Sequence, residues 1–413
     1  MHILVFHQYY LFAGAPGGSR FNELARLWAE LGHRVTVVAG TVNYSTGEVP
    51  ERYRGKLVTR ERDGAVDVLR AWVPTSFSKG YLGRALGFGG FAAAATSAIA
   101  MVERPDVVIA TSPPLPIVLP GLVAAKRFGV PLVFEVRDLW PESAVTTGVL
   151  NEGSPLTAAL YRLEREAYRR ADRINVLTPA FGEDIERRGL ATTKKIWFVP
   201  NGADTDAFSP GAKDEDLRRE LGWGDRFVAM YAGAHGRANA LQQLIEAAER
   251  LRGRPDILIA SVGDGPERAA LEEAVRARSL SNIRFHGPFA KNKMPGLVRT
   301  CDAGLAVLQN NPTFRTVYPN KVFDYMSCEK PTVLGIDGVA RKMVCDDARA
   351  GLFAEPENAA ALADALVALA DNPDLRAQLG RSGARWVREN VKREALAARY
   401  ASLLEGLVRE RQR

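Results

Sequence analysis

Hydrophobic and polar positions in the first half of the chain follow two patterns, short β-branched runs and longer stretches with apolar residues at helical spacing. An amphipathic helix is predicted at Asn22–Leu31 and an apolar helix around Ile117–Arg127. Strand, helix and strand in this order favour a parallel sheet with helices on both faces. The short runs predict strands at Ile3–Phe6, Arg34–Ala39, Val66–Trp72, Asp106–Ala110, Leu132–Val136, Arg173–Leu177 and Ile196–Val199.

The pattern pauses near residue 200 and then repeats. Val199-Pro200-Asn201-Gly202 leads into a polar segment, residues 209–220, after which the β-branched runs resume. Two similar α/β halves joined near residue 200 are the simplest explanation, each with a doubly wound parallel sheet. The resumed runs predict strands at Phe227–Tyr231, Ile257–Val262, Ile283–Phe285, Ala303–Val307 and Thr332–Gly335.

The composition is that of an ordinary globular protein. Of 413 residues, 46% are hydrophobic and 25% are charged, which excludes a disordered chain. The 55 Lys and Arg residues exceed the 48 Asp and Glu residues and give a net charge of +7, which fits an anionic small molecule or an anionic membrane surface. Because the arginines are spread over both halves, the sequence argues against a nucleic-acid binder.

The cysteines and the apolar stretches exclude several other classes of protein. The three cysteines form no Cys-x-x-Cys pair, which argues against a disulfide framework and against a zinc site. The first residues lack the pattern of a signal peptide, so a cytoplasmic location is expected. Residues 85–102 carry no charge, but they are mostly Ala and Gly, and we interpret them as a buried helix rather than a membrane span.

Ligands bind beyond the carboxyl ends of strands in open parallel sheets, so the loops after strands form the candidate site. In the first such loop, Gly17 and Gly18 would let the backbone approach a ligand ahead of a helix. The spacing differs from a dinucleotide fingerprint, and a loop without a ligand is the alternative. In residues 135–142, Arg137 and Asp138 are interpreted as groups that hold a charged or polyhydroxylated substrate. A structural ion-pair network is the alternative there.

Two glycine-rich turns follow strands in the second half. Residues 231–237 end in Arg237 ahead of a predicted helix at Leu241–Arg250, which suits a phosphate, although a solvated helix start is equally compatible. Residues 263–267 have Pro266 at a first helical position, and by themselves indicate only a turn.

The most informative loop is Tyr318–Met326. Pro319 suits the start of a helix, which leaves the amides of Asn320 and Lys321 unpaired. These amides, the helix dipole and the charge of Lys321 predict an anion site. Asp324 lies one turn further on the same face, where a carboxylate can accept hydrogen bonds from a ribose diol. The loop therefore predicts a nucleotide site, with a surface Lys321–Asp324 ion pair as the alternative.

Taken together, these loops resemble retaining GT-B glycosyltransferases of the glycogen-synthase-like class, family 4. Pro200-Asn201-Gly202-Ala203-Asp204, with Phe208, resembles the segment that opens the second domain of those enzymes. Residues 263–266 and 285–287 resemble strand-end loops of that domain. Residues 135–142 and 319–326 are similar to a narrower branch, the fucosamine-transferase-like enzymes of bacterial capsule, O-antigen and exopolysaccharide synthesis.

The resemblance covers nearly the whole chain and implies the GT-B fold, with two Rossmann-like domains facing a cleft. The first, which would bind the acceptor, is expected at residues 1–200, completed by a C-terminal helix at 386–413. The second, which would bind the nucleotide sugar, is expected at residues 201–385.

Position by position, the resemblance also implies roles. Asp324 matches the second acid of the family's E-x7-E motif, which holds the nucleotide ribose, whereas Thr316 replaces the first acid. The family's Arg and Lys on the diphosphate fall at Ala234 and Asn239. Both cations are therefore missing.

The resemblance to the narrower branch indicates which residues replace these two missing cations. Arg237 and Lys321 are expected to contact the diphosphate instead. Arg137 lies where many relatives have a His beside the reacting carbon. His286 and Phe289, after a strand of the second half, are expected near the nucleotide, Phe289 where a backbone group meets the base.

The implied activity is transfer of a sugar, with retention, from a nucleotide-diphosphate sugar, expected to be UDP-linked, to a hydroxyl of a glycan or polyprenyl-diphosphate-linked acceptor. Arg137, Asp138, Arg237 and Lys321 are the expected catalytic groups. No metal or cofactor is expected, because these cations would neutralise the leaving diphosphate and the sequence offers no obvious D-x-D.

Other interpretations stay open. A nucleotide-sugar epimerase of the same fold could use Glu135, Asp138 and Glu142 for proton transfer, and a non-catalytic nucleotide- or solute-binding protein would also have a cleft. Residues 76–91 combine basic and aromatic side chains that could contact an anionic bilayer, although an ordinary cleft-lining helix explains them as well.

Overall fold

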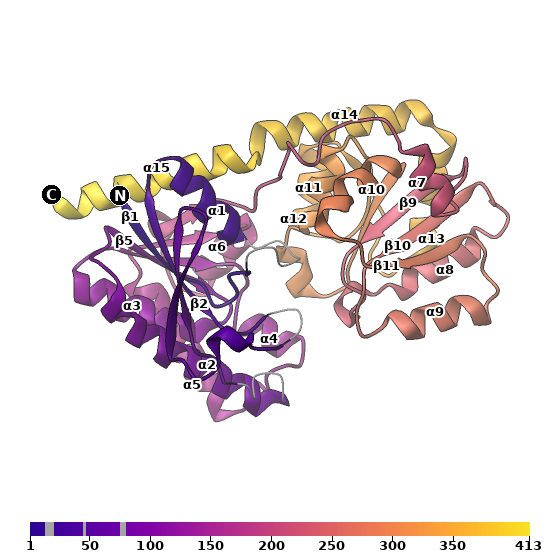
Figure 1. Ribbon diagram of the computed structural model, residues 1–413. Helices are drawn as coiled ribbons and strands as arrows, with labels where there is room; N and C mark the ends of the chain where they lie inside the picture. Colours follow the sequence, from indigo (N-terminus) through magenta and orange to yellow (C-terminus); the bar gives the residue numbers. More distant parts are fainter. Residues whose placement is uncertain (13–19, 44–46, 75–79) are drawn as a thin grey trace. The chain divides into compact units, whose positions relative to one another are not determined.

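The computed structural model describes residues 1–12, 20–43, 47–74 and 80–413 (Figure 1). The chain forms two compact units, one of Met1–Pro200 with Glu394–Arg413 and one of Asn201–Arg393. Each unit contains one sheet with helices packed against it. The predicted α/β class with two doubly wound sheets is therefore confirmed.

The first unit contains an eight-stranded sheet of order β3-β4-β2-β1-β5-β6-β7-β8. Every neighbouring pair is parallel except β3 and β4, which are antiparallel. β3 was not predicted, because its sequence VTRERD ends in four consecutive charged residues and contains no apolar run. It lies at the partly exposed edge of the sheet. The strands are β1 (His2–Phe6), β2 (Arg34–Gly40), β3 (Val58–Asp63), β4 (Val66–Ala71), β5 (Val107–Ser112), β6 (Leu132–Val136), β7 (Arg173–Val176) and β8 (Ile196–Phe198).

The helices of the first unit include the uncharged stretch at residues 85–102. Its residues up to Ala98 belong to α2, which buries Phe91 and Ala95 but leaves Leu86 exposed, and Ile99–Met101 form a 3₁₀ turn. Among the helices described, none has the length and apolar character needed to cross a membrane. The helices are α1 (Arg20–Glu30), α2 (Gly80–Ala98), α3 (Val118–Phe128), α4 (Glu142–Thr146), α5 (Pro155–Arg170) and α6 (Pro179–Arg187).

The second unit contains a six-stranded parallel sheet of order β11-β10-β9-β12-β13-β14. Its last strand was not predicted, because its three residues, Gly, Leu and Phe, include no β-branched side chain. The strands are β9 (Phe227–Ala232), β10 (Ile257–Val262), β11 (Ile283–Gly287), β12 (Ala303–Val307), β13 (Thr332–Gly335) and β14 (Gly351–Phe353). The helices are α7 (Glu215–Glu220), α8 (Gln242–Arg250), α9 (Arg268–Ala277), α10 (Met294–Thr300), α11 (Asn320–Ser327), α12 (Val339–Arg341), α13 (Ala359–Asp371) and α14 (Pro373–Asn390).

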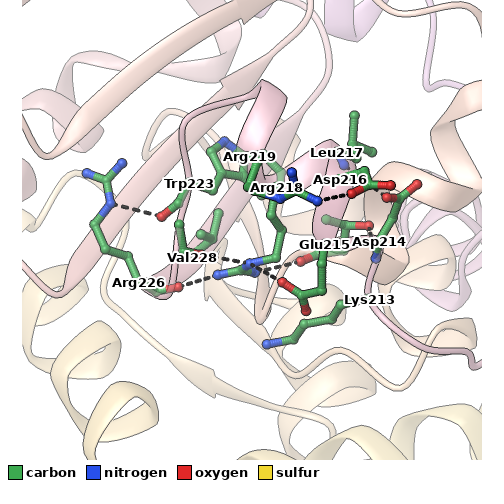
Figure 2. A network of polar contacts seen from close by, with 12 residues as sticks. Lys213, Asp214, Glu215, Asp216, Leu217, Arg218, Arg219, Trp223, Arg226 and Val228 are labelled. Carbon is green, nitrogen blue, oxygen red and sulfur yellow. Dashed lines mark hydrogen bonds and ion pairs between the residues drawn. The ribbon is translucent and has the colours of Figure 1, made fainter.

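A buried arginine fixes the segment that leads into β9 (Figure 2). Arg218 of α7 is only 3% exposed, and its guanidinium donates to the carbonyls of Gly224, Arg226 and Thr300 at 2.9, 2.6 and 2.9 Å. Asp302, 3.5 Å from Arg218 Nη1, also accepts the backbone N–H of Val228 at 2.9 Å. These bonds connect the chain just before β9 and the chain just before β12 to one guanidinium.

The C-terminal segment differs from the expected helix at 386–413. Residues 386–390 belong to α14, which packs so closely in the second unit that a Cβ at Gly383 would lie 2.9 Å from Ala350 Cβ. A new helix, α15 (Arg393–Gln412), then returns to the first unit, where the Trp28 indole donates to the Ala397 carbonyl at 3.0 Å. The break follows α14 because residues 391–393 bond with residue 203 instead of continuing the helix.

Candidate functional site

Two glycine-rich loops follow β9 and β10 and brace each other. A Cβ at Gly263 would stand 1.9 Å from the Gly233 carbonyl oxygen, and one at Gly265 would stand 2.5 Å from the His235 carbonyl oxygen. The backbone N–H of His235 donates to the Asp264 carbonyl at 2.9 Å. The 263–267 loop, which the sequence indicated only as a turn, thus holds the 233–237 loop in place through backbone contact that only glycine permits.

Lys321 lies against the first of these loops. Its Nζ is 3.7 Å from the centre of the Tyr231 ring, a cation–π contact, and a Cβ at Gly233 would come within 2.7 Å of it. Among the residues described, no carboxylate pairs with this ammonium. Burial lowers the pKa of Lys321 to about 7. A shielded cation without a counter-ion favours an anionic ligand, which would restore its charge.

The start of α11 provides further donors. Pro319 precedes the helix with φ −73° and ψ 118°, and the first intrahelical N–H to find an acceptor is that of Val322, on the Pro319 carbonyl at 3.1 Å. The amides of Asn320 and Lys321 have no acceptor among the described residues. The predicted proline-led helix start with two free amides is therefore present at this position.

Asp324 lies one turn after these amides. Burial raises the pKa of its carboxyl to about 7, although Arg393 and Lys291 oppose the rise. No hydrogen bond or ion pair of this side chain occurs in the described parts of the chain, so the alternative of a Lys321–Asp324 ion pair is excluded. A shielded carboxylate without donors favours a ligand that carries hydroxyl groups.

Tyr325, which sequence reasoning missed, fixes α11 on the sheet. Its hydroxyl accepts the backbone N–H of Ala232 at 2.9 Å. Its ring fills the space above Gly304, where a Cβ would lie 2.1 Å from the ring. The helix that carries Lys321 and Asp324 is thereby held against the end of β9, the strand from which the glycine-rich loop departs.

Arg237 begins a short 3₁₀ turn, Arg237–Asn239, directly after the glycine-rich loop. Its side chain is exposed and makes no hydrogen bond or ion pair with other described residues. The turn is tied to the sheet because the Gln309 N–H donates to the Ala238 carbonyl at 3.0 Å. Its expected role on the diphosphate stays a prediction.

His286 and Phe289 lie at and after the end of β11. The indole of Trp223 donates to His286 Nε2 at 3.0 Å, and burial lowers the pKa of this histidine to about 4, so the ring is neutral. Phe289 packs against the core around Trp223. One ring nitrogen of His286 therefore has a structural task, and the nucleotide contacts of both residues stay predictions.

A buried histidine that the sequence did not single out lies inside the glycine-rich loop. His235 stacks on Tyr231 with ring centres 6.1 Å apart and meets Phe285 edge-on at 5.5 Å. Its Nε2 is 2.8 Å from Ser261 Oγ. The His235 ring thus packs against the same Tyr231 side chain that contacts the Lys321 ammonium. Thr316, in the place of the family's first acid, donates to the Thr313 carbonyl at 2.7 Å.

Arg137 and Asp138 belong to the first unit, after β6. The Asp138 carboxylate accepts the Ser143 hydroxyl at 2.8 Å, and burial raises its pKa. The Arg137 N–H donates to the Ser112 carbonyl at 2.9 Å, which fixes the backbone at the carboxyl end of the strand. Their proposed contact with substrate stays a prediction. Gly17 and Gly18 lie outside the described residues.

Glu135 has a structural role instead of facing a ligand. It is fully buried and accepts from Arg20 Nε at 2.5 Å, Asn175 Nδ2 at 2.9 Å and Tyr400 Oη at 2.8 Å. These donors come from α1, β7 and α15, so one carboxylate joins the C-terminal helix to the first sheet. Glu142 likewise accepts the Tyr161 hydroxyl at 2.7 Å.

Family models match both units of the chain. A glycosyl transferase 4-like domain matches residues 17–202, and a glycosyl transferases group 1 domain matches residues 226–372. The chain is therefore a glycosyltransferase, with the group 1 family matched by its second unit. In this glycosyltransferase the described residues contain no cluster of three or more His, Cys, Asp or Glu side chains that could hold a metal.

The glycosyltransferase is also similar to individual proteins. It is 27% identical over 318 residues to WcaI of Escherichia coli K12, named for colanic acid biosynthesis, across 75% of this chain and 77% of WcaI. It is 26% identical over 267 residues to alpha-D-kanosaminyltransferase of Streptomyces kanamyceticus, across 63% of this chain and 66% of that enzyme. HepE of Anabaena, solved in complex with UDP, matches with a TM-score of 0.74 at 17% identity, covering 98% of this chain and 100% of HepE. This likeness shows that the fold is GT-B.

Proposed function

We propose that this glycosyltransferase moves a sugar, with retention of configuration, from a UDP-linked donor to a hydroxyl of a glycan or polyprenyl-diphosphate-linked acceptor. The observation that carries the donor assignment is the pair of uncompensated groups near the amino end of α11. Lys321 has no anionic partner and Asp324 has no donor within the described residues, and they lie three positions apart. A nucleoside diphosphate supplies both missing partners, because it carries a pyrophosphate beside a ribose diol.

The donor would bind with its pyrophosphate at the amino end of α11. The free amides of Asn320 and Lys321, the Lys321 ammonium and the helix dipole all favour negative charge there. The proposed second cation is the exposed side chain of Arg237, which directly follows the glycine-rich loop after β9. Asp324 would accept the ribose hydroxyls, and Phe289 would lie by the base.

In the proposed reaction the bond between the anomeric carbon and the diphosphate oxygen breaks, and the acceptor hydroxyl oxygen bonds to that carbon. The bonding electrons leave with the nucleoside diphosphate, which also takes the acceptor proton. The α11 amides, Lys321 and Arg237 would stabilise the developing charge on the leaving group. Because they supply this stabilisation, we propose that the reaction needs no metal.

The acceptor side of the proposal rests on resemblance and on the first unit. Arg137 and Asp138 follow β6 at the carboxyl edge of its sheet, where ligands of such sheets bind. The sequence similarity to the fucosamine-transferase-like branch, and WcaI as a relative, support a role in cell-envelope polysaccharide synthesis. The exposed Leu86 of α2 supports the proposal that residues 76–91, of which 76–79 lie outside the described residues, touch a bilayer that holds a lipid-linked acceptor.

Transfer is favoured over epimerisation by the carboxylates of the first unit. An epimerase needs free acids for proton transfer, and Glu135 accepts three hydrogen bonds from the protein. Glu142 and Asp138 are also engaged, with Tyr161 and Ser143. Donor incubated without acceptor should therefore keep its sugar configuration.

Isothermal titration with UDP in excess EDTA tests the donor site. Wild-type protein is expected to bind, and Asp324→Ala is expected to weaken binding about 10- to 100-fold, the range for hydrogen bonds to a charged group. Asp346→Ala removes an exposed aspartate of the same unit and is expected to leave affinity unchanged. If no nucleoside diphosphate binds wild type, the proposal is wrong.

A further inference from the structure

The chain enters the second unit at Asn201 and leaves it at Arg393, and these two segments are bonded to each other. The Ala203 N–H donates to the Val391 carbonyl at 2.8 Å, and the Arg393 N–H donates to the Ala203 carbonyl at 3.0 Å. A Cβ at Gly202 would stand 2.7 Å from Arg393 Cα. Glycine is therefore required for the two segments to come this close.

The first of these segments also contacts the amino end of α11. Asn201 Nδ2 donates to Asn320 Oδ1 at 2.8 Å, so the first residue of the unit is tied to the first residue of the helix. The Arg393 guanidinium pairs with Asp204 Oδ2 at 3.0 Å. The charged groups that act on Asp324 are this pair and Lys291.

The charges beside Asp324 have opposite effects. Arg393 and Lys291 favour its ionised form, whereas Asp204 disfavours it, and Arg393 has the largest effect of the three on the pKa of Asp324. Because Asp204 fixes the Arg393 guanidinium at 3.0 Å, the position of that positive charge is determined by the crossing segments themselves.

We propose that Asn201 and Arg393 are positioning residues for nucleotide binding, which hold the amino end of α11 and the charge beside Asp324 through the paired crossing segments. The inference rests on the proposed function, since it assigns these residues to the same donor site. Neither residue needs to touch the nucleotide. Asn201 acts through Asn320, and Arg393 acts through its field on Asp324.

Titration of UDP into variants over a series of pH values tests the inference. Asn201→Ala is expected to weaken binding about fivefold, the scale of one neutral hydrogen bond, and to add nothing when Asn320→Ala is already present. Arg393→Gln is expected to move the acid side of the affinity profile to higher pH, and Arg393→Lys to move it back. Lys392→Gln is the matched control, because that ammonium lies 4.0 Å from Asp206 instead.

The outcomes separate the inference from the function on which it rests. If wild type binds UDP and both Asn201→Ala and Arg393→Gln bind within a factor of two with the same pH midpoint, the inference is overturned and the donor site stands. If wild type does not bind UDP, both are overturned. Should Arg393→Gln lose its folded state by circular dichroism, Asn201→Ala decides alone, because its hydrogen bond is exposed.

Discussion

The ammonium of Lys321 lies 3.7 Å from the centre of the Tyr231 ring, with no carboxylate beside it among the residues that the structure describes. The aromatic face compensates only part of the cost of shielding this charge, so the position is most stable when an anion binds. The Lys321–Tyr231 contact thus connects the end of β9 to the start of α11 at the proposed pyrophosphate site.

Lys321→Met is expected to weaken UDP binding about 10- to 100-fold, because a charge-assisted hydrogen bond to phosphate is lost. The side chain keeps most of its apolar length, so the Tyr231 packing is preserved. Lys342→Met is the matched control, since the Lys342 side chain is 68% exposed and its ammonium pairs with Asp347. Equal affinity of wild type and Lys321→Met, measured by calorimetry, would contradict the role given to Lys321.

The pH dependence of UDP affinity is expected to be bell-shaped around pH 7. Burial lowers the pKa of Lys321 to about 7, so affinity falls above that pH as the free protein loses the ammonium. Burial raises the pKa of Asp324 to about 7, so affinity falls below that pH as the carboxylate that accepts the ribose hydroxyls is protonated.

The two sides of this profile are separable by substitution. Lys321→Arg keeps its charge at every accessible pH and should remove the alkaline side. Asp324→Asn cannot ionise and should remove the acid side. Calorimetric affinities at intervals between about pH 5.5 and 9 check both expectations, because this range lies between the reference pKa values of Asp and Lys. A flat wild-type profile would contradict the assignment of both groups.

The fold was largely predictable because its strands are continuous apolar runs. In a parallel sheet both faces are covered, so β1 and β10 are buried along their whole length and stand out from the helices between them. β3 lacks this signal because it is an edge strand with charged residues. The end of α14 was misplaced because its stop depends on pairing of residues 391–393 with residue 203, nearly two hundred positions earlier.

The candidate site was predictable only where its signal is local. Pro319, Asn320, Lys321 and Asp324 lie within six consecutive positions at the start of one helix, so capping and spacing rules apply directly. The role of Glu135 depends instead on Tyr400, 265 positions away. No local pattern distinguishes such a carboxylate from one that faces a substrate.

Arg218→Ala is expected to destabilise the second unit by about 3–5 kcal/mol, because a buried ion pair is broken and three carbonyls lose their donor (Figure 2). Arg219→Ala, the neighbouring residue in the same helix, removes only an exposed pair with Asp216 and should cost under about 0.5 kcal/mol. Thermal unfolding of both variants measures the difference. Similar melting temperatures for the two variants would contradict the stabilising role given to Arg218 in the network of Figure 2.

Glu135→Gln is expected to destabilise the first unit by about 3 kcal/mol while leaving UDP affinity unchanged. The neutral amide cannot balance Arg20, and its NH₂ group must take the place of either the oxygen that accepts from Arg20 or the oxygen that accepts from Asn175 and Tyr400, so it meets a donor in both orientations. The same variant tests the epimerase alternative, in which Glu135 would transfer a proton. If Glu135→Gln kept the melting temperature of wild type but stopped solvent deuterium from entering the donor sugar, the carboxylate would be an acid–base catalyst. We expect the reverse, a lower melting temperature and no deuterium incorporation by either protein.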